Sequence, residues 1–171
     1  MTGQINVNKI AARTGNTITI NSGDKISGAA GSIVAPGQVL QCVQYYAANP
    51  GAQTTTSTSF VASGIKKTIT PKASGNLIIV QASISMSYAD SHGWAKLYMN
   101  GSSMASAGNY HMGYINNSYN TYSGLAMQAQ HTTTGTSALE FEIYIKVGAT
   151  GTFTYVHSSA SAALTLWEIA Q

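Results

Sequence analysis

The chain has 171 residues, enough for one domain with a substantial core or one domain plus an arm. Only 8% of the residues are charged, against about 25% in an average globular protein, but ten Tyr and many Thr, Ile and Val argue against disorder. Scattered basic residues exclude the basic stripe of a nucleic-acid-binding protein, and one cysteine, Cys42, excludes a disulfide framework.

The first 37 residues are rich in glycine and poor in aromatic residues, so they could not build a core alone. We expect residues 1–37 to form an extended arm that lies on a neighbouring subunit or docks on another protein. The alternative is that they supply the first strands of the domain that follows, residues 38–171.

Strand-like periodicity continues through the middle of the chain. Strands are predicted at 39–46, at 59–61 and 65–70 on either side of Ser63-Gly64, and at 76–88. The last of these is apolar on both faces at its start and alternates afterwards. Cys42 lies in an apolar stretch, which predicts a buried small side chain.

The second half of the chain continues the pattern, with strands predicted at 94–99, 125–130, 139–147, 152–156 and 163–169. Asn100-Gly101 predicts a hairpin turn after the first of them. Residues 139–147 alternate most clearly, with Phe141, Ile143 and Ile145 on one face. Glu140, Glu142, Tyr144 and Lys146 lie on the other, where Lys146 is expected to offset the two carboxylates.

No segment has a helical period. Eight or more short strands with Gly- and Asn-rich turns predict an all-β fold, an antiparallel β-sandwich over residues 38–171, with a jelly roll as the preferred topology.

The closing strand predicts assembly, because large apolar residues occupy both of its faces and such a strand needs two partners. We expect a symmetric homo-oligomer whose interface includes Leu164, Leu166, Trp167 and Ile169.

Catalytic and metal-binding patterns are scarce, so we expect no enzymatic activity, no cofactor and no metal. Glu140 and Glu142 share a strand face and cannot flank a glycosidic bond. Asp90-Ser91-His92 contains the residue types of a hydrolase triad, but triads are assembled in space rather than in sequence. The four histidines have no close metal-ligand spacing, although a trimer could bring one from each subunit to its axis.

Residues 88–122 interleave aromatic side chains with asparagines, a composition that suits adaptable binding surfaces. Aromatic faces stack on the apolar faces of sugars, and amides bind their hydroxyls. The alternative is that these rings pack between strands or subunits. The predicted ligand-binding residues for a glycan or other receptor are Trp94, Tyr98, Tyr110, His111, Tyr114, Tyr119 and Tyr122.

Three stretches carry a family resemblance. The first lies within 15–41 and consists of Gly15-Asn16-Thr17-Ile18-Thr19-Ile20 with residues 24–28 and 35–41. The second lies within 56–80 and consists of residues 56–65, 68–71 and 76–80. The third is the ending Leu164-Thr165-Leu166-Trp167-Glu168-Ile169-Ala170-Gln171. Together they resemble virion structural proteins of marine tailed phages, especially cyanophages: tail-fibre C-terminal domains and related decoration proteins.

This resemblance implies a trimeric β-sandwich head preceded by an attachment segment that contacts other virion proteins. The expected function is therefore that of a phage virion structural protein, a tail-fibre or spike head domain that contributes to recognition of host-surface glycans. The alternative is a capsid decoration or another purely structural component. We expect assembly in the host cytoplasm, incorporation into the virion and no membrane insertion, because no apolar run reaches about 18 residues.

Overall fold

A computed structural model describes residue 22 and residues 34–88, 92–104, 113–116, 121–149, 151–156 and 159–171. These residues are organised as strands and connecting turns, with no helix among them, which confirms the predicted all-β fold. Nothing in the described part of the chain forms a helix that could cross a membrane. The chain divides into two compact units, 1–33 and 34–171. The predicted arm, residues 1–37, lies outside the described residues except for Ser22 and residues 34–37.

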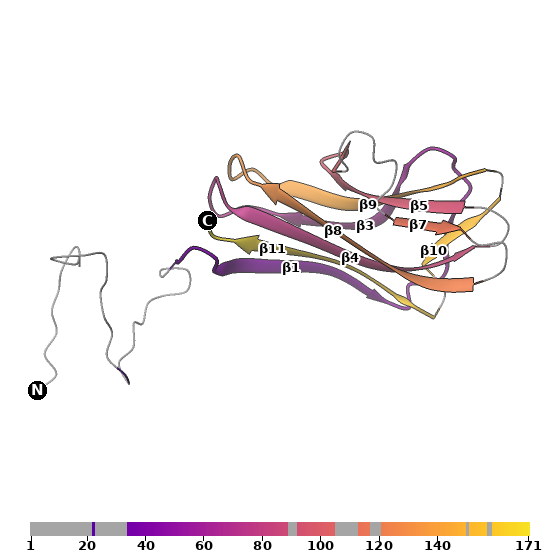
Figure 1. Cartoon of the computed structure of the whole chain (residues 1–171), viewed down its shortest axis with the longest axis horizontal. Helices are drawn as coiled ribbons and strands as arrows, with labels where there is room; N and C mark the ends of the chain where they lie inside the picture. Colours follow the sequence, from indigo (N-terminus) through magenta and orange to yellow (C-terminus); the bar gives the residue numbers. More distant parts are fainter. Residues whose placement is uncertain are drawn as a thin grey trace, which may run out of the picture. The chain divides into compact units, whose positions relative to one another are not determined.

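The strands of the second unit form two antiparallel sheets, seen as two layers in Figure 1. Within the described ranges, the first sheet, sheet A, has six strands: β1 (Val39–Ala48), β2 (Gln53–Thr55), β4 (Leu77–Tyr88), β8 (Thr121–Thr132), β10 (Phe153–Val156) and β11 (Ser161–Ile169). The second, sheet B, has five: β3 (Val61–Ile69), β5 (His92–Met99), β6 (Ser102–Ser103), β7 (Gly113–Asn116) and β9 (Leu139–Val147).

The strand pairs are nested in the sequence. β1 pairs with β11, β3 with β9, β4 with β8, and β5 with β7. These four pairs alternate between the two sheets, as in one long hairpin folded over, and the short pair of β2 with β10 extends sheet A. β11 also pairs with β4, and β9 pairs with β5, which joins the pairs within each sheet. This nesting is that of a jelly roll, the topology that the sequence favoured.

The core lies between the two sheets, because each strand turns alternate side chains inwards. From sheet A it receives Ile78, Val80, Ile84, Leu164 and Leu166, and from sheet B it receives Leu97, Phe141, Ile143, Ile145 and Val147.

Leu164 and Leu166 are fully buried in this core, which corrects their predicted place in a subunit interface. The closing strand is apolar on both faces, as the sequence indicated, but these two leucines meet the opposite sheet of the same chain.

Two glycine-containing segments differ in their role. Asn100 and Gly101 both have positive φ, 48° and 77°, and join β5 to β6, which confirms the predicted hairpin turn. Ser63-Gly64 does not separate two strands as the sequence suggested. β3 continues through it, with a shift in register against β9 between Ala62 and Lys66. Gly64 has a φ of 78°, and its N–H donates to Oε1 of Glu142 at 2.9 Å, so a carboxylate satisfies the backbone where the ladder is interrupted.

A buried carboxylate, that of Glu168, connects three segments of the fold by hydrogen bonds. Glu168 of β11 is 0% exposed and accepts hydrogen bonds from the Gln41 side chain (2.5 Å), the Lys72 N–H (2.7 Å) and the Asn76 side chain (2.6 Å). Burial raises the pKa of Glu168, but the hydrogen bonds outweigh burial and hold the pKa below its usual value. One charge therefore links β11 to β1 and to the segment between β3 and β4.

Backbone hydrogen bonds connect the first residues of the second unit to Ala170, next to the C-terminal residue. The Gly37 N–H donates to the Ala170 carbonyl at 2.7 Å, and the Ala170 N–H donates to the Gln38 carbonyl at 2.9 Å. The last residues of the predicted arm thus continue the pairing of β1 with β11.

Candidate functional site

Sheet A presents an outer face without charge, which we call the neutral face. It is made by the outward side chains of four neighbouring strands, β1, β11, β4 and β8, whose registers place them in common rows. These residues are Cys42, Gln44, Tyr46, Leu77, Ile79, Gln81, Ser83, Ser85, Gly124, Ala126, Gln128, Gln130, Thr132, Ala163, Thr165, Trp167 and Ile169. None is Asp, Glu, Lys, Arg or His.

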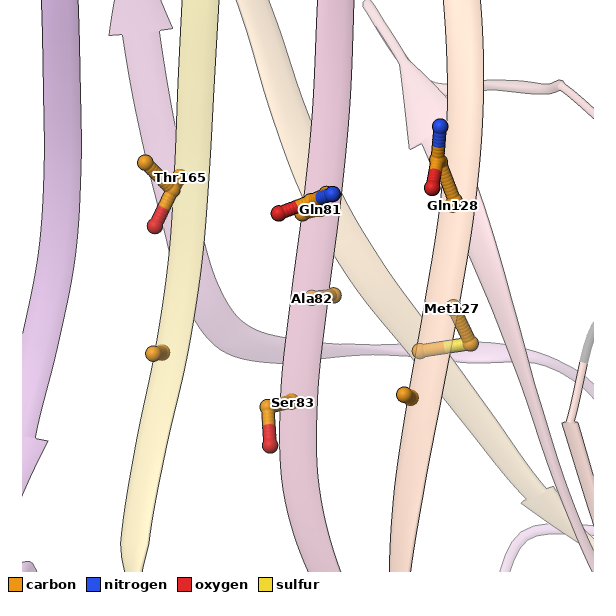
Figure 2. A pocket seen from close by; sticks show the side chains of 8 residues that line it. Gln81, Ala82, Ser83, Met127, Gln128 and Thr165 are labelled. Atoms are coloured by element: carbon orange, nitrogen blue, oxygen red, sulfur yellow. The ribbon is translucent and has the colours of Figure 1, made fainter.

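The middle of the neutral face is shallow and polar. A row of Gln44, Thr165, Gln81 and Gln128 crosses all four strands, and the Gln44 amide donates to the Thr165 hydroxyl at 2.9 Å. Figure 2 shows the last three of these side chains on adjacent strands. Beside them, small side chains leave a depression of about 460 Å³. Its floor is lined by Ser83, Ala126 and Ala163, among others.

Apolar groups surround this polar row. Tyr46 is 62% exposed, Trp167 and Ile169 are half-buried, and Cys42 is exposed in register with Trp167. The exposure of Cys42 corrects the prediction that it is buried: the alternation of β1 turns Val43 and Tyr45 towards the core and Cys42 outwards.

A neutral, partly apolar face is unusual for a sheet that contacts water, since solvated faces of antiparallel sheets are normally polar and carry charge. Four strands spaced about 4.8 Å apart and some nine residues long, at about 3.3 Å each, project to roughly 500–600 Å². Side chains corrugate such a surface, so its accessible area is of the order of the ~800 Å² that each partner contributes to a standard interface. The neutral face has the size and chemistry of an interface.

Sheet B has a different outer face, where aromatic rings alternate with lysines. Trp94 lies opposite Lys146, and Lys96 lies opposite Tyr144, on the paired strands β5 and β9. Tyr98 stacks on Tyr144 with ring centroids 3.8 Å apart and planes 12° from parallel. The aromatic–lysine cluster comprises these residues and Phe60: Phe60, Trp94, Lys96, Tyr98, Tyr144 and Lys146. Each is half-buried.

Phe60 joins the cluster from outside the sheet. Its ring centroid lies 6.3 Å from that of Tyr98, 4.8 Å from the Lys96 Nζ and 5.1 Å from the Lys146 Nζ. The Lys146 Nζ also lies 4.6 Å from the Trp94 ring centroid. The loop that carries Phe60 is fixed by the Val147 N–H, which donates to the Ser57 carbonyl at 2.8 Å. Both ammonium groups are therefore directed to one ring that is held in place.

The carboxylates on this face have other partners. Glu140 pairs with Lys66 at 3.0 Å, and Glu142 is nearly buried and accepts the Gly64 N–H. The hydrogen bond and the charge of Glu140 raise the pKa of Lys66. The expectation that Lys146 offsets the two carboxylates is thus wrong, because the shared register of β3 and β9 brings Lys66 to them instead.

Electrostatics and burial act on the cluster itself. Burial lowers the pKa of Lys96, and the positive charge of Lys146 lowers it further. Burial likewise raises the pKa of Tyr98, with a contribution from Tyr144. Within the described ranges, neither Lys96 nor Lys146 has a carboxylate at ion-pairing distance.

Of the predicted ligand-binding residues, Trp94 and Tyr98 lie in this cluster, on one face of β5. Tyr114 is in β7, in register with Trp94, and Tyr122 is in β8. Tyr110, His111 and Tyr119 lie outside the described residues. The sequence reasoning missed Phe60 and Lys96 as members of a site. The alternation of residues 139–147 did place Tyr144 and Lys146 outwards together.

No group of three metal-ligating side chains occurs among the residues that the structure describes. Of the triad-like Asp90-Ser91-His92, Asp90 and Ser91 lie outside them.

In comparisons with known proteins, the chain matches no family model and no curated protein sequence.

Proposed function

We propose that this chain is a non-enzymatic structural protein of a phage particle that works as a homo-oligomer, and that sister copies cover the neutral face of sheet A. The observation that carries the proposal is the neutral face itself: four neighbouring strands of outward side chains without one charge.

A second copy of the same chain is the partner that this chemistry fits best. Interfaces between different proteins commonly use complementary charge for recognition. A face without charge meets a copy of itself without like-charge repulsion, and closed symmetry is the usual form of soluble homo-oligomers. Trp167, Ile169 and Tyr46 would supply apolar area at about 25 cal/mol per Å² buried, and the glutamine amides would pair across the contact.

Assignment to a phage particle is supported by the resemblance of residues 15–41, 56–80 and the C-terminal strand to virion proteins of marine tailed phages. The low charge of the chain and the jelly-roll nesting agree with it, since jelly rolls occur in viral capsid domains, although the fold alone does not specify a function. We propose that the oligomer is a trimer and that residues 1–37 contact other virion proteins.

The assembly is tested by placing a charge on the neutral face. Ala126→Glu puts a carboxylate on β8, at an exposed position of this face. Ala62→Glu is the matched control, an exposed alanine on β3 at the outer face of sheet B. Light scattering after size-exclusion chromatography should give a multiple of 17.8 kDa for the wild type and Ala62→Glu, and 17.8 kDa for folded Ala126→Glu. A monomeric wild type, or an oligomer that Ala126→Glu leaves intact, would refute the proposed interface.

The place on the particle is tested by electron microscopy of virions with a labelled copy of the chain. Density on the tail or over the capsid supports a structural role, and absence from purified particles contradicts it.

The aromatic–lysine cluster favours a second candidate function, recognition of a host-surface glycan, which would place the protein at the distal end of the tail. Trp94 and Tyr98 were predicted as ligand residues, and the cluster groups them with further rings on a face separate from the neutral face. Adsorption of the purified protein to host cells, compared between wild type and Trp94→Ala, tests this role. Equal adsorption would refute it.

A further inference from the structure

We infer that the aromatic–lysine cluster of sheet B binds an acidic sugar, with its carboxylate between the Lys96 and Lys146 ammonium groups and its ring against the neighbouring aromatic side chains. The inference rests on the second candidate function, surface recognition, and names its ligand class. It does not depend on assembly through the neutral face.

The first support is a pair of like charges that no described carboxylate neutralises. The Lys96 and Lys146 ammonium groups lie 4.8 Å and 5.1 Å from the centre of one ring, that of Phe60. The two like charges repel each other: the positive charge of Lys146 is the second cause of the lowered pKa of Lys96, after burial. An anion between them would remove the repulsion and gain two charge-assisted hydrogen bonds.

The second support is that, among the residues the structure describes, neither acid near the lysines serves that purpose. Glu140 is paired with Lys66 at 3.0 Å, and Glu142 accepts the Gly64 N–H at 2.9 Å. These are the two acidic residues of β9, which carries Lys146 and lies beside the strand of Lys96. The described side chains therefore leave the lysine pair available to a ligand.

The third support distinguishes a sugar from a simple anion. Phe60, Trp94, Tyr98 and Tyr144 surround the two lysines and are half-buried, so part of each side chain contacts solvent. A pyranose ring presents apolar C–H groups that stack on aromatic faces, and aromatic residues at binding sites supply large contact area at low entropy cost. A uronic acid combines such a ring with one carboxylate, and this combination matches the cluster.

The experiment measures binding of tetragalacturonate to the full chain by isothermal titration calorimetry. Maltotetraose serves as the uncharged sugar probe, and tetraglutamate as an anion without sugar rings. We expect tetragalacturonate to bind, and the other two probes to bind at least about tenfold more weakly, a difference of one decade in Kd.

Variants locate the site. Lys96→Gln and Lys146→Gln should each weaken tetragalacturonate binding about tenfold, since each removes one charged hydrogen-bond donor. Lys72→Gln is the matched control, because it makes the same change in net charge at an exposed residue between β3 and β4 and should leave affinity unchanged within about twofold. Phe60→Leu keeps apolar volume but removes the ring and should also weaken binding. Near-ultraviolet circular dichroism verifies that each variant is folded.

Failure of the acidic-sugar assignment can be distinguished from failure of surface recognition. Absence of tetragalacturonate binding, equal binding of tetraglutamate, or equal losses in Lys72→Gln and Lys96→Gln would overturn the inference. If host adsorption still requires Trp94 in that case, surface recognition stands and only the acidic-sugar assignment fails.

Discussion

Replacing Glu168 by Gln should destabilise the sandwich strongly although the side chain keeps its shape. Glu168 is 0% exposed and accepts three hydrogen bonds of 2.5–2.7 Å from Gln41, Lys72 and Asn76. The substitution removes the charge that strengthens these bonds and turns an amide NH₂ towards at least one donor. Hydrogen bonds to a charged group contribute about 1.5–3 kcal/mol each, and an unsatisfied buried donor costs about 1–3 kcal/mol. We expect the free energy of unfolding to fall by about 2–4 kcal/mol in total, because the neighbouring groups relax in part.

The assay is urea unfolding at pH 7 and fixed protein concentration, followed by tryptophan fluorescence. Glu140→Gln is the control. This substitution removes the ion pair with Lys66. The Lys66 side chain is 51% exposed and that of Glu140 is 42% exposed, so the free energy of unfolding should change by less than about 1 kcal/mol. If Glu168→Gln costs no more than Glu140→Gln, the buried hydrogen bonds do not contribute as argued.

The same variant has a defined pH dependence. The folded-state pKa of Glu168 lies below its unfolded value, so its ionisation stabilises the fold above that unfolded value, about 4.3, and the contribution is lost as pH falls through the folded pKa. The stability difference between wild type and Glu168→Gln should therefore shrink on acidification from pH 5 downwards. A difference that stays constant, or that grows, has the wrong sign for this explanation.

Two glycine substitutions test the packing and the bulge by the same unfolding assay. Gly93→Ala in β5 would place a Cβ against the ring of Phe153 and should cost about 1–3 kcal/mol. Gly135→Ala, between β8 and β9 and away from the neutral face, meets no atom within 4 Å and should cost nothing measurable. Equal effects of the two substitutions would contradict the close contact of Gly93 with Phe153. Gly64→Ala has open space around it but a φ of 78°, so backbone strain alone should cost about 1–2 kcal/mol, and an unchanged stability would show that the bulge relaxes.

Strand positions and side-chain alternation could be predicted from the sequence, because they depend on a local period of two. The alternation of residues 139–147 predicted that Phe141, Ile143 and Ile145 share one face, and Asn100-Gly101 predicted a hairpin turn. The structure confirms both, with the three side chains in the core. Ser63-Gly64 was misinterpreted since a glycine with positive φ serves a bulge as well as a turn. Only the carboxylate of Glu142, from a strand remote in sequence, shows which of the two it is.

The surfaces could be predicted only in part, because they depend on register between strands. The closing strand was correctly seen to have two apolar faces, but the sequence does not say which face meets the opposite sheet. Leu164 and Leu166 do, and Trp167 and Ile169 lie outside. Similarly, Trp94 and Lys146 meet because β5 and β9 pair in a particular register, and Phe60 reaches them from another loop.

The reactivity of Cys42 tests most directly whether sister copies cover the neutral face. Cys42 is exposed on the single chain and lies in register with Trp167, within the proposed interface. We expect a thiol reagent to label Cys42 slowly in the native wild-type oligomer, and at the rate of the urea-unfolded chain in folded Ala126→Glu. A native wild-type protein whose Cys42 reacts as fast as the unfolded chain would show that the neutral face is open, and would contradict its burial between sister copies.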